Sequence, residues 1–195
     1  MIESLEAIKV IGQHRKRAIV VTTMTSGHEW PQVSTNPDLD LALWGCMGKA
    51  SSLGLGLALA QPAKKVIVLD ADGSLLMNLG SLVTIANMAP PNLVHFVFEN
   101  DVYRKSGGQP IPNAGKFNFA GLAKAAGYAH VHRCDDLAGL ENEIEAIMNQ
   151  PGPTFVCLKV PTTTEPPFPP RASAGAGVIS DISPQFSVAV QSRAG

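Results

Sequence analysis

Cysteine, net charge and long apolar runs are all scarce in this sequence. The 195 residues hold three cysteines, far apart and odd in number, Cys46, Cys134 and Cys157. They fit reduced thiols in a cytoplasmic protein better than a disulfide framework or a cysteine metal site. A net charge of −1 offers no basic field for nucleic acid.

Features of a membrane or secreted protein are missing as well. No apolar run reaches the roughly 18 residues that a membrane-spanning helix needs. The start of the chain, Met1–Ser4, lacks the basic and apolar regions of a signal peptide. We therefore expect a cytoplasmic location, with neither nucleic acid nor a membrane as partner.

Composition and patterning point instead to a compact α/β domain. Hydrophobic residues make up 45% of the chain and charged residues 16%. Short apolar runs typical of buried strands alternate with segments of helical spacing. We expect strands at 18–22, 41–44, 66–70, 93–98, 128–132 and 154–160, and helices at 5–11, 48–60, 75–88, 117–126 and 137–148. We predict one domain over 1–160. The Pro/Ala/Gly-rich segment 161–195 should be an extended arm without a core of its own.

Two of the expected strands end in oxygen-bearing side chains. Asp72 follows the strand that starts at Val66, and Asn100 follows the strand Leu93–Phe98. Ligands bind at the carboxyl ends of parallel strands in open α/β sheets. Asp and Asn oxygens suit Mg²⁺, and a helix start presents N–H groups that suit a phosphate. The sequence therefore predicts a site for a metal–diphosphate at this edge of the sheet.

These residues resemble a motif of the thiamine-diphosphate (ThDP) enzymes, G-D-G followed some two dozen residues later by N-N. The matching positions are Ala71-Asp72-Gly73 and Glu99-Asn100, so Ala71 and Glu99 depart from the motif. The resemblance implies that the ligands of Mg²⁺ are Asp72, Asn100 and the backbone carbonyl of Val102. It also implies that Gly73 and Ser74 offer N–H groups to the diphosphate, with Tyr103 beside the cofactor.

The resemblance is closer to the phosphonopyruvate and sulfopyruvate decarboxylases, especially the small ThDP-binding subunit of the latter. It is carried by Gly45–Gly56, which is similar to G-S-M-G-x-A-S-x-x-G-L-G, and by Pro91–His95 and Ser106–Gln109. It implies a three-layer α/β/α fold with a mainly parallel sheet. This fold is that of the diphosphate-binding (PP) domain.

Two further segments enter the predicted cofactor site through the same resemblance. The loop after the first strand would contact the diphosphate through Ser26, Gly27 and His28. An ordinary polar loop is an equal alternative for this segment.

The turn at 45–48 would hold the aminopyrimidine side of the cofactor. Gly45 and Gly48 would shape this turn, and Met47 would prop ThDP into its bent form. Without the family resemblance, Met47 would be interpreted as an ordinary core methionine.

The implied activity is decarboxylation of a small anionic 2-oxo acid with ThDP and Mg²⁺. Such enzymes use a Glu on a pyrimidine-binding (PYR) domain to activate the cofactor. No stretch of this chain resembles that domain, so the catalytic Glu should lie on a PYR-domain partner subunit. The isolated chain should then pair with itself through the partner face. Candidate cations for the substrate's anionic tail are Lys49, Arg104 and Lys105.

Other interpretations remain open. The chain could be half of a ThDP-dependent carboligase, similar to acetolactate synthase, or of an oxidoreductase. It could be a non-catalytic ThDP-fold interaction protein. A nucleotide-binding site at Gly54-Leu55-Gly56 is disfavoured because no strand leads directly into these glycines. His130 and His132 alternate on a strand without a convincing third ligand, so surface histidines are expected.

Overall fold

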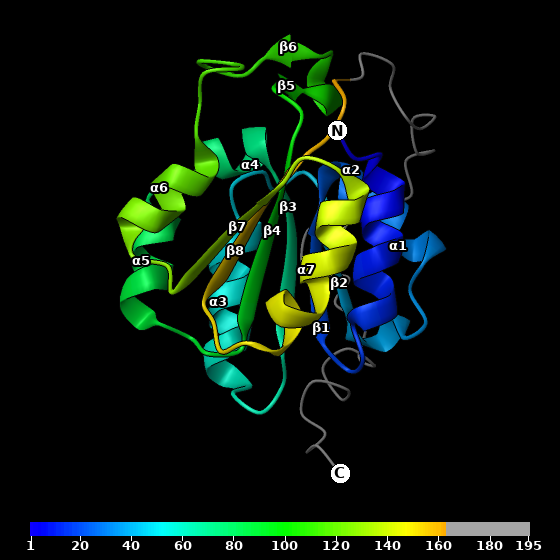
Figure 1. The fold of residues 1–195 in the computed structure, drawn as a ribbon, viewed down its shortest axis with the longest axis vertical. Helices are drawn as coiled ribbons and strands as arrows, with labels where there is room; N and C mark the ends of the chain where they lie inside the picture. The colour runs from blue at the N-terminus through cyan, green and yellow to red at the C-terminus, as the bar shows by residue number, and fades with distance from the viewer. Residues whose placement is uncertain (163–195) are drawn as a thin grey trace.

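The computed structural model describes residues 1–162 and shows a sheet enclosed between two layers of helices (Figure 1). Most of the predicted arm at 161–195 lies outside the described residues. The main sheet has six parallel strands in the order β2-β1-β3-β4-β8-β7. They are β1 (Ile19–Thr23), β2 (Asp40–Leu43), β3 (Val66–Ala71), β4 (Leu93–Glu99), β7 (His130–Cys134) and β8 (Thr154–Lys159). The predicted α/β/α architecture is confirmed.

One layer of helices covers one face of the sheet with small and aliphatic side chains. It contains α3 (Ala50–Ala60), α4 (Asp72–Leu76), α5 (Ser81–Met88) and α6 (Phe119–Ala126). Gly54 lets the backbone of α3 pack closely against β3, because a Cβ there would lie 2.2 Å from Val68 Cγ2. Leu55, Ile85 and Phe119 fill the core between these helices and the strands.

The second layer covers the opposite face. It contains α1 (Ser4–His14), α2 (Met24–Glu29) and α7 (Leu137–Asn149). Leu140, Ile144 and Ile147 recur at helical spacing on α7 and are buried against the sheet. Asp136 caps the start of α7, because its carboxylate accepts the N–H of Gly139 at 2.8 Å.

Helices differ from the sequence expectation in two segments. Residues 23–30 contain helix α2 in place of the polar loop; its start is fixed by Ser26, whose hydroxyl binds both the N–H and the carbonyl of Thr23. The single helix expected over 75–88 is split into α4 and α5. Asn78 lies in the break, and its amide donates to the Gly48 carbonyl at 3.0 Å. The apolar spacing over 75–88 therefore does not form one continuous helix.

A short antiparallel pair, β5 (Val102–Tyr103) and β6 (Gln109–Pro110), lies above the carboxyl ends of the main strands. The chain therefore forms a second, small sheet next to the carboxyl ends of the main strands. Within the part of the chain that the structure describes, no helix is both long and apolar enough to cross a membrane.

Candidate metal and diphosphate site

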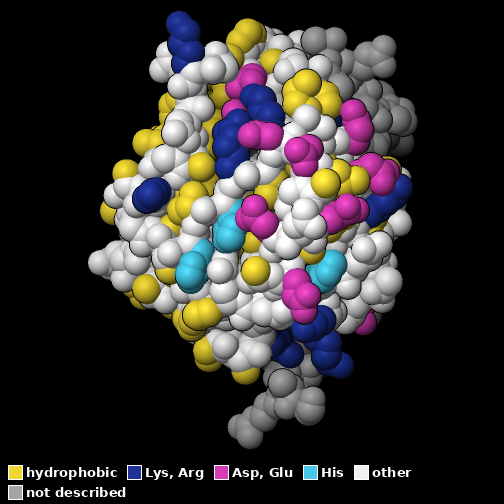
Figure 2. All heavy atoms as spheres, in the orientation of Figure 1, with side chains coloured by type: hydrophobic (Ala, Val, Ile, Leu, Met, Phe, Trp, Pro, Cys, Tyr) yellow, Lys and Arg dark blue, Asp and Glu magenta, His cyan; other side chains and the backbone are white. Residues whose placement is uncertain are grey.

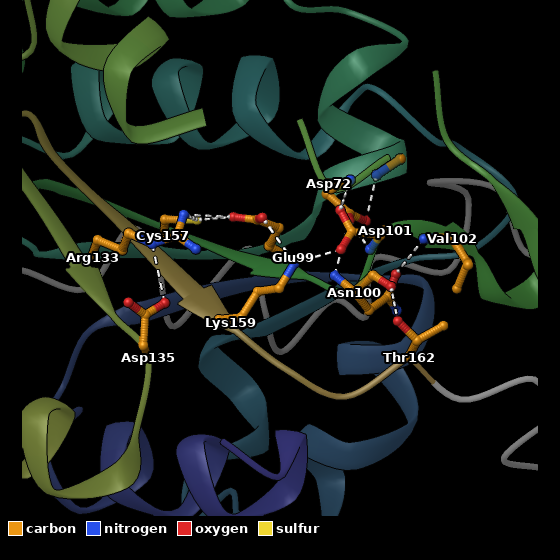
Figure 3. Close-up of polar contacts among 12 residues, drawn as sticks. Asp72, Glu99, Asn100, Asp101, Val102, Arg133, Asp135, Cys157, Lys159 and Thr162 are labelled. Carbon is orange, nitrogen blue, oxygen red and sulfur yellow. Dashed lines mark hydrogen bonds and ion pairs between the residues drawn. The ribbon is translucent and has the colours of Figure 1, made fainter. Parts of the chain in front are cut away.

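Asp72 is the first residue of α4, directly after β3, and its side chain is completely buried. The register pairs Ala71 of β3 with Phe98 of β4, so the loop after β4 begins beside Asp72. Asp72 Oδ2 accepts the backbone N–H of Asn100 at 2.8 Å and that of Asp101 at 2.7 Å (Figure 3). The two predicted ligand residues are therefore brought together by hydrogen bonds between their loops.

The electrostatics of Asp72 are those of a buried acid without a cation. Burial raises the pKa of its carboxyl to about 6, although backbone N–H groups of Asp101, Gly73 and Asn100 act in the opposite direction. No ion pair to Asp72 exists among residues 1–162. A bound cation would supply the charge that this carboxylate lacks.

The donor set fits Mg²⁺. Asp72 Oδ1 accepts one hydrogen bond, from Gly73 N–H at 2.7 Å, and so keeps a lone pair. Asn100 Oδ1 likewise accepts one, from Val102 N–H at 3.0 Å. Carboxylate and amide oxygens from two adjacent strand ends are hard ligands of the kind that Mg²⁺ takes.

Half of the predicted cofactor residues line a single small cavity above these oxygens. The predicted residues that line it are Met47, Gly73, Ser74, Asn100, Val102 and Tyr103. Ser74 also fixes the neighbouring turn, because its hydroxyl accepts the N–H of Gly48 at 3.0 Å. Gly48 has φ +77°, a conformation that favours glycine. Its turn is held from a second side by Asn78.

The other predicted residues do not line this cavity. The Ser26 hydroxyl is buried and donates to the Leu69 carbonyl at 2.7 Å, so it ties α2 to β3. Gly27 lies against Trp44, and the His28 ring contacts the same indole in a tilted arrangement with ring centroids 4.5 Å apart. Gly45 is exposed at φ +69°. In this structure, the hydroxyl of Ser26 and the ring of His28 are engaged within the protein.

Sequence reasoning missed several residues at this edge. Met24 and Thr25, at the start of α2, line the same cavity, and Met24 has φ +52°, which is uncommon for a residue with a side chain. A neighbouring cavity of about 120 Å³ is lined by the buried carboxyl of Glu29 and by Arg104. Burial raises the pKa of Glu29, opposed by a Ser4 hydrogen bond and by the charges of Arg104 and Lys105. The only sequence feature that pointed to these residues of α2 was the polar segment that follows the first strand.

The histidines of β7 form no metal site. His132 Nδ1 pairs with Glu143 at 2.6 Å, and its Nε2 contacts Gln150. Among the described residues, no group of three His, Cys, Asp or Glu side chains is placed to hold a metal ion. His130 and His132 are both half-buried rather than fully exposed on the surface.

The family model for the thiamine pyrophosphate enzyme C-terminal TPP-binding domain matches residues 11–158. The match covers nearly all of the sheet, helices α2 to α7 and the Asp72–Asn100 site. This chain therefore belongs to the thiamine pyrophosphate enzymes and corresponds to their C-terminal, TPP-binding domain.

Within this family, the chain is similar to two characterised kinds of decarboxylase. The chain is 39% identical over 146 residues to a phosphonopyruvate decarboxylase of Streptomyces viridochromogenes, covering 75% of this chain and 36% of that protein. It is 34% identical over 161 residues to the sulfopyruvate decarboxylase subunit beta of Methanothermobacter thermautotrophicus, covering 82% of this chain and 83% of the subunit. The chain thus spans about a third of the first protein and most of the second.

Among solved structures, the benzoylformate decarboxylase of Polynucleobacter necessarius superposes with a TM-score of 0.69 at 18% identity. The match covers 84% of this chain and 34% of that one. At this identity the likeness concerns the fold, and it confirms the arrangement of sheet and helices.

Proposed function

We propose that this chain is the ThDP-binding subunit of a Mg²⁺-dependent 2-oxo acid decarboxylase of the sulfopyruvate and phosphonopyruvate type. The observation that carries the proposal is the junction of Asp72 with the Asn100 loop at 2.7–2.8 Å, directly below a cavity lined by Gly73, Ser74 and Tyr103. The relatives named above support the reaction class.

Each part of the site has a task in this proposal. Asp72, Asn100 and the Val102 carbonyl would hold Mg²⁺. Gly73 and Ser74, at the start of α4, would face the diphosphate, and Met47 would support the pyrimidine side. When bound, ThDP would supply the electron sink for loss of carbon dioxide. The protein's contribution is to anchor the charged end of the cofactor and fix its orientation.

A second chain completes the enzyme in this proposal. The chain covers 83% of a protein named as a subunit beta, which supports a partner subunit. We propose that the partner carries the PYR domain with the activating Glu. Without it, the isolated chain would pair with itself through the same face, bind ThDP weakly and turn over slowly.

The substrate would be a small 2-oxo acid with an anionic tail. Arg104 and Lys105 line the cavity beside Asn100, whereas Lys49 is exposed ahead of α3. The Nε of Arg104 is buried without a hydrogen-bond partner among the described residues. Arg104 is therefore better placed than Lys49 to receive an anion.

Thermal unfolding with added ligands tests the cofactor assignment. We expect ThDP with MgCl2 to raise the Tm. ThDP alone, MgCl2 alone and NAD should each have little effect on the Tm. A ligand at a hundred times its Kd stabilises by about 2.7 kcal/mol. The Asn100→Ala variant should lose this response, and Asn87→Ala, at an exposed position on α5, should keep it. If the Tm of the wild-type chain does not rise, either alone or with a PYR-domain chain, ThDP binding is contradicted.

Reconstitution tests the reaction. The chain would be mixed with a PYR-domain subunit, ThDP and MgCl2, and supplied with sulfopyruvate, phosphonopyruvate or pyruvate. We expect carbon dioxide and an aldehyde from a substrate with an anionic tail. Acetolactate as the product, or a requirement for an electron acceptor, would instead assign the chain to a carboligase or an oxidoreductase.

A further inference from the structure

Glu99 occupies the position at which the ThDP motif has its first Asn, and the structure gives it a different environment. Its side chain is buried, with 3% of the residue exposed, at the end of β4. The carboxylate contacts three groups from the neighbouring strands: Arg133 Nη1 at 3.0 Å, Lys159 Nζ at 3.0 Å and the Cys157 thiol at 2.9 Å (Figure 3). Glu99 therefore joins β4 to β7 and β8.

Lys159 links this carboxylate to the turn after β4. Its ammonium also pairs with Asp101 Oδ2, so one cation bridges the residues on both sides of Asn100. Arg133 reaches Glu99 as well, but its second ion-pair partner is Asp135, two residues further along the chain. In Figure 2, basic and acidic side chains alternate near the top of the molecule, in the region of the strands' carboxyl ends in Figure 1.

The turn that Lys159 holds is also the turn that meets the metal site. Asp101 has φ +66°, an uncommon conformation for a non-glycine residue, and its N–H donates to Asp72 Oδ2. Its side chain is fixed at both oxygens, by Lys159 and by Gly115 N–H at 3.0 Å. Any movement of Asp101 would therefore move the Asn100 ligand relative to Asp72.

We propose that Lys159 is a positioning residue for the metal site. By bridging Glu99 and Asp101, it holds the Asn100 turn in the conformation in which Asn100 and Asp72 face a common ion. This inference rests on the function proposed above. Glu99 and Lys159 together would take over the role of the amide missing from the motif, since groups outside the ligand set orient the ligands themselves.

Arg133 provides a matched control for Lys159. Lys159→Met and Arg133→Met each remove one cation from Glu99, but only Lys159→Met removes the cation that is hydrogen-bonded to Asp101. The readout is the Mg²⁺ concentration that gives half of the ThDP-induced rise in Tm. We expect Lys159→Met to raise this concentration about tenfold, in line with the effect of removing groups that orient ligands. Arg133→Met should lower the Tm of the free chain without changing the Mg²⁺ requirement.

Three additional measurements strengthen the test. Lys159→Arg, which keeps the charge, should bring the Mg²⁺ requirement back toward the wild-type value. Asp101→Asn, which tolerates the same backbone conformation, should raise it as Lys159→Met does, and the double variant should be no worse than either alone. Amide hydrogen exchange of Asn100 and Asp101 without cofactor should accelerate in Lys159→Met and not in Arg133→Met.

The outcomes separate the two proposals. If the wild-type chain gains no stability from ThDP with Mg²⁺, alone or with a partner, the proposed function is overturned and this inference with it. If the wild type responds but Lys159→Met and Arg133→Met have equal Mg²⁺ requirements, the inference alone is overturned. If Lys159→Met does not fold, Asp101→Asn decides by the same comparison.

Discussion

The ring of Tyr103 lies directly against Gly73. A Cβ added to Gly73 would lie 2.6 Å from Tyr103 Cδ1 and 2.7 Å from Cε1. The motif glycine after Asp72 therefore has a packing reason in this chain, because it leaves room for a ring from the β5 segment above the start of α4. Both residues line the cavity where the diphosphate is proposed to bind.

Gly73→Ala should disturb this cavity from within. The added methyl group must displace Tyr103, and overpacking of this kind costs about 1–3 kcal/mol. We expect a lower Tm and loss of the stabilisation by ThDP with Mg²⁺. Gly56→Ala is the control, because a Cβ there meets no atom within 4 Å. Equal responses of the two variants to ThDP would contradict a cofactor site at Gly73.

Gly48→Ala tests the turn that Ser74 and Asn78 hold. An L-residue at φ +77° is strained, by about 1–2 kcal/mol, and the new Cβ would lie 3.1 Å from Met77 Cβ. We expect a lower free energy of unfolding, measured in urea, and weaker ThDP binding. Asn78→Ala should weaken ThDP binding in the same direction by releasing the Gly48 carbonyl. Unchanged ThDP affinity in both variants would remove this turn from the site.

Glu99→Asn restores the residue that the family motif has, and we expect it to destabilise this chain. The substitution leaves Arg133 and Lys159 without their shared buried carboxylate, and breaking a buried ion pair costs about 3–5 kcal/mol, less here because both cations are partly exposed. Urea unfolding measures the loss. Glu141→Asn, at an exposed position on α7, should cost about 0.5 kcal/mol through helix propensity. A gain in stability from Glu99→Asn would contradict the role given to the carboxylate.

Mg²⁺ binding should depend on pH through Asp72, whose pKa is raised by burial to about 6. Between about pH 4 and pH 6 the folded chain holds a proton that the unfolded chain releases, so without cofactor stability falls as pH rises through this window. Mg²⁺ needs the ionised carboxylate. Its half-saturating concentration for ThDP stabilisation should therefore rise steeply below pH 6 and be level above pH 7. Titrations at pH 5, 6, 7 and 8 measure this, and a flat profile would exclude Asp72 as a ligand.

The sequence predicted the framework of the site because that framework depends on local signals. Buried apolar runs predicted β3 and β4. Because ligand sites lie at the carboxyl ends of parallel strands, Asp72 and Asn100 were predicted to lie close together. Contacts between distant residues could not be predicted in the same way. The split between α4 and α5 depends on Asn78 reaching Gly48, and Glu99 gains its partners from β7 and β8. Neither relationship leaves a periodic pattern in the sequence.

Because the six main strands are parallel, all their carboxyl ends lie at one end of the sheet, which holds the proposed site. All their amino ends lie at the opposite end, which we call the spare edge. Asp72, Asn100 and their supporting turns all belong to the edge where the strands end, so the turns at the other edge carry none of the proposed ligands. The turn at 61–65, between α3 and β3, is one of these. A fluorescent reporter grafted there would be carried far from the cofactor, which makes the spare edge the place to attach probes or tethers.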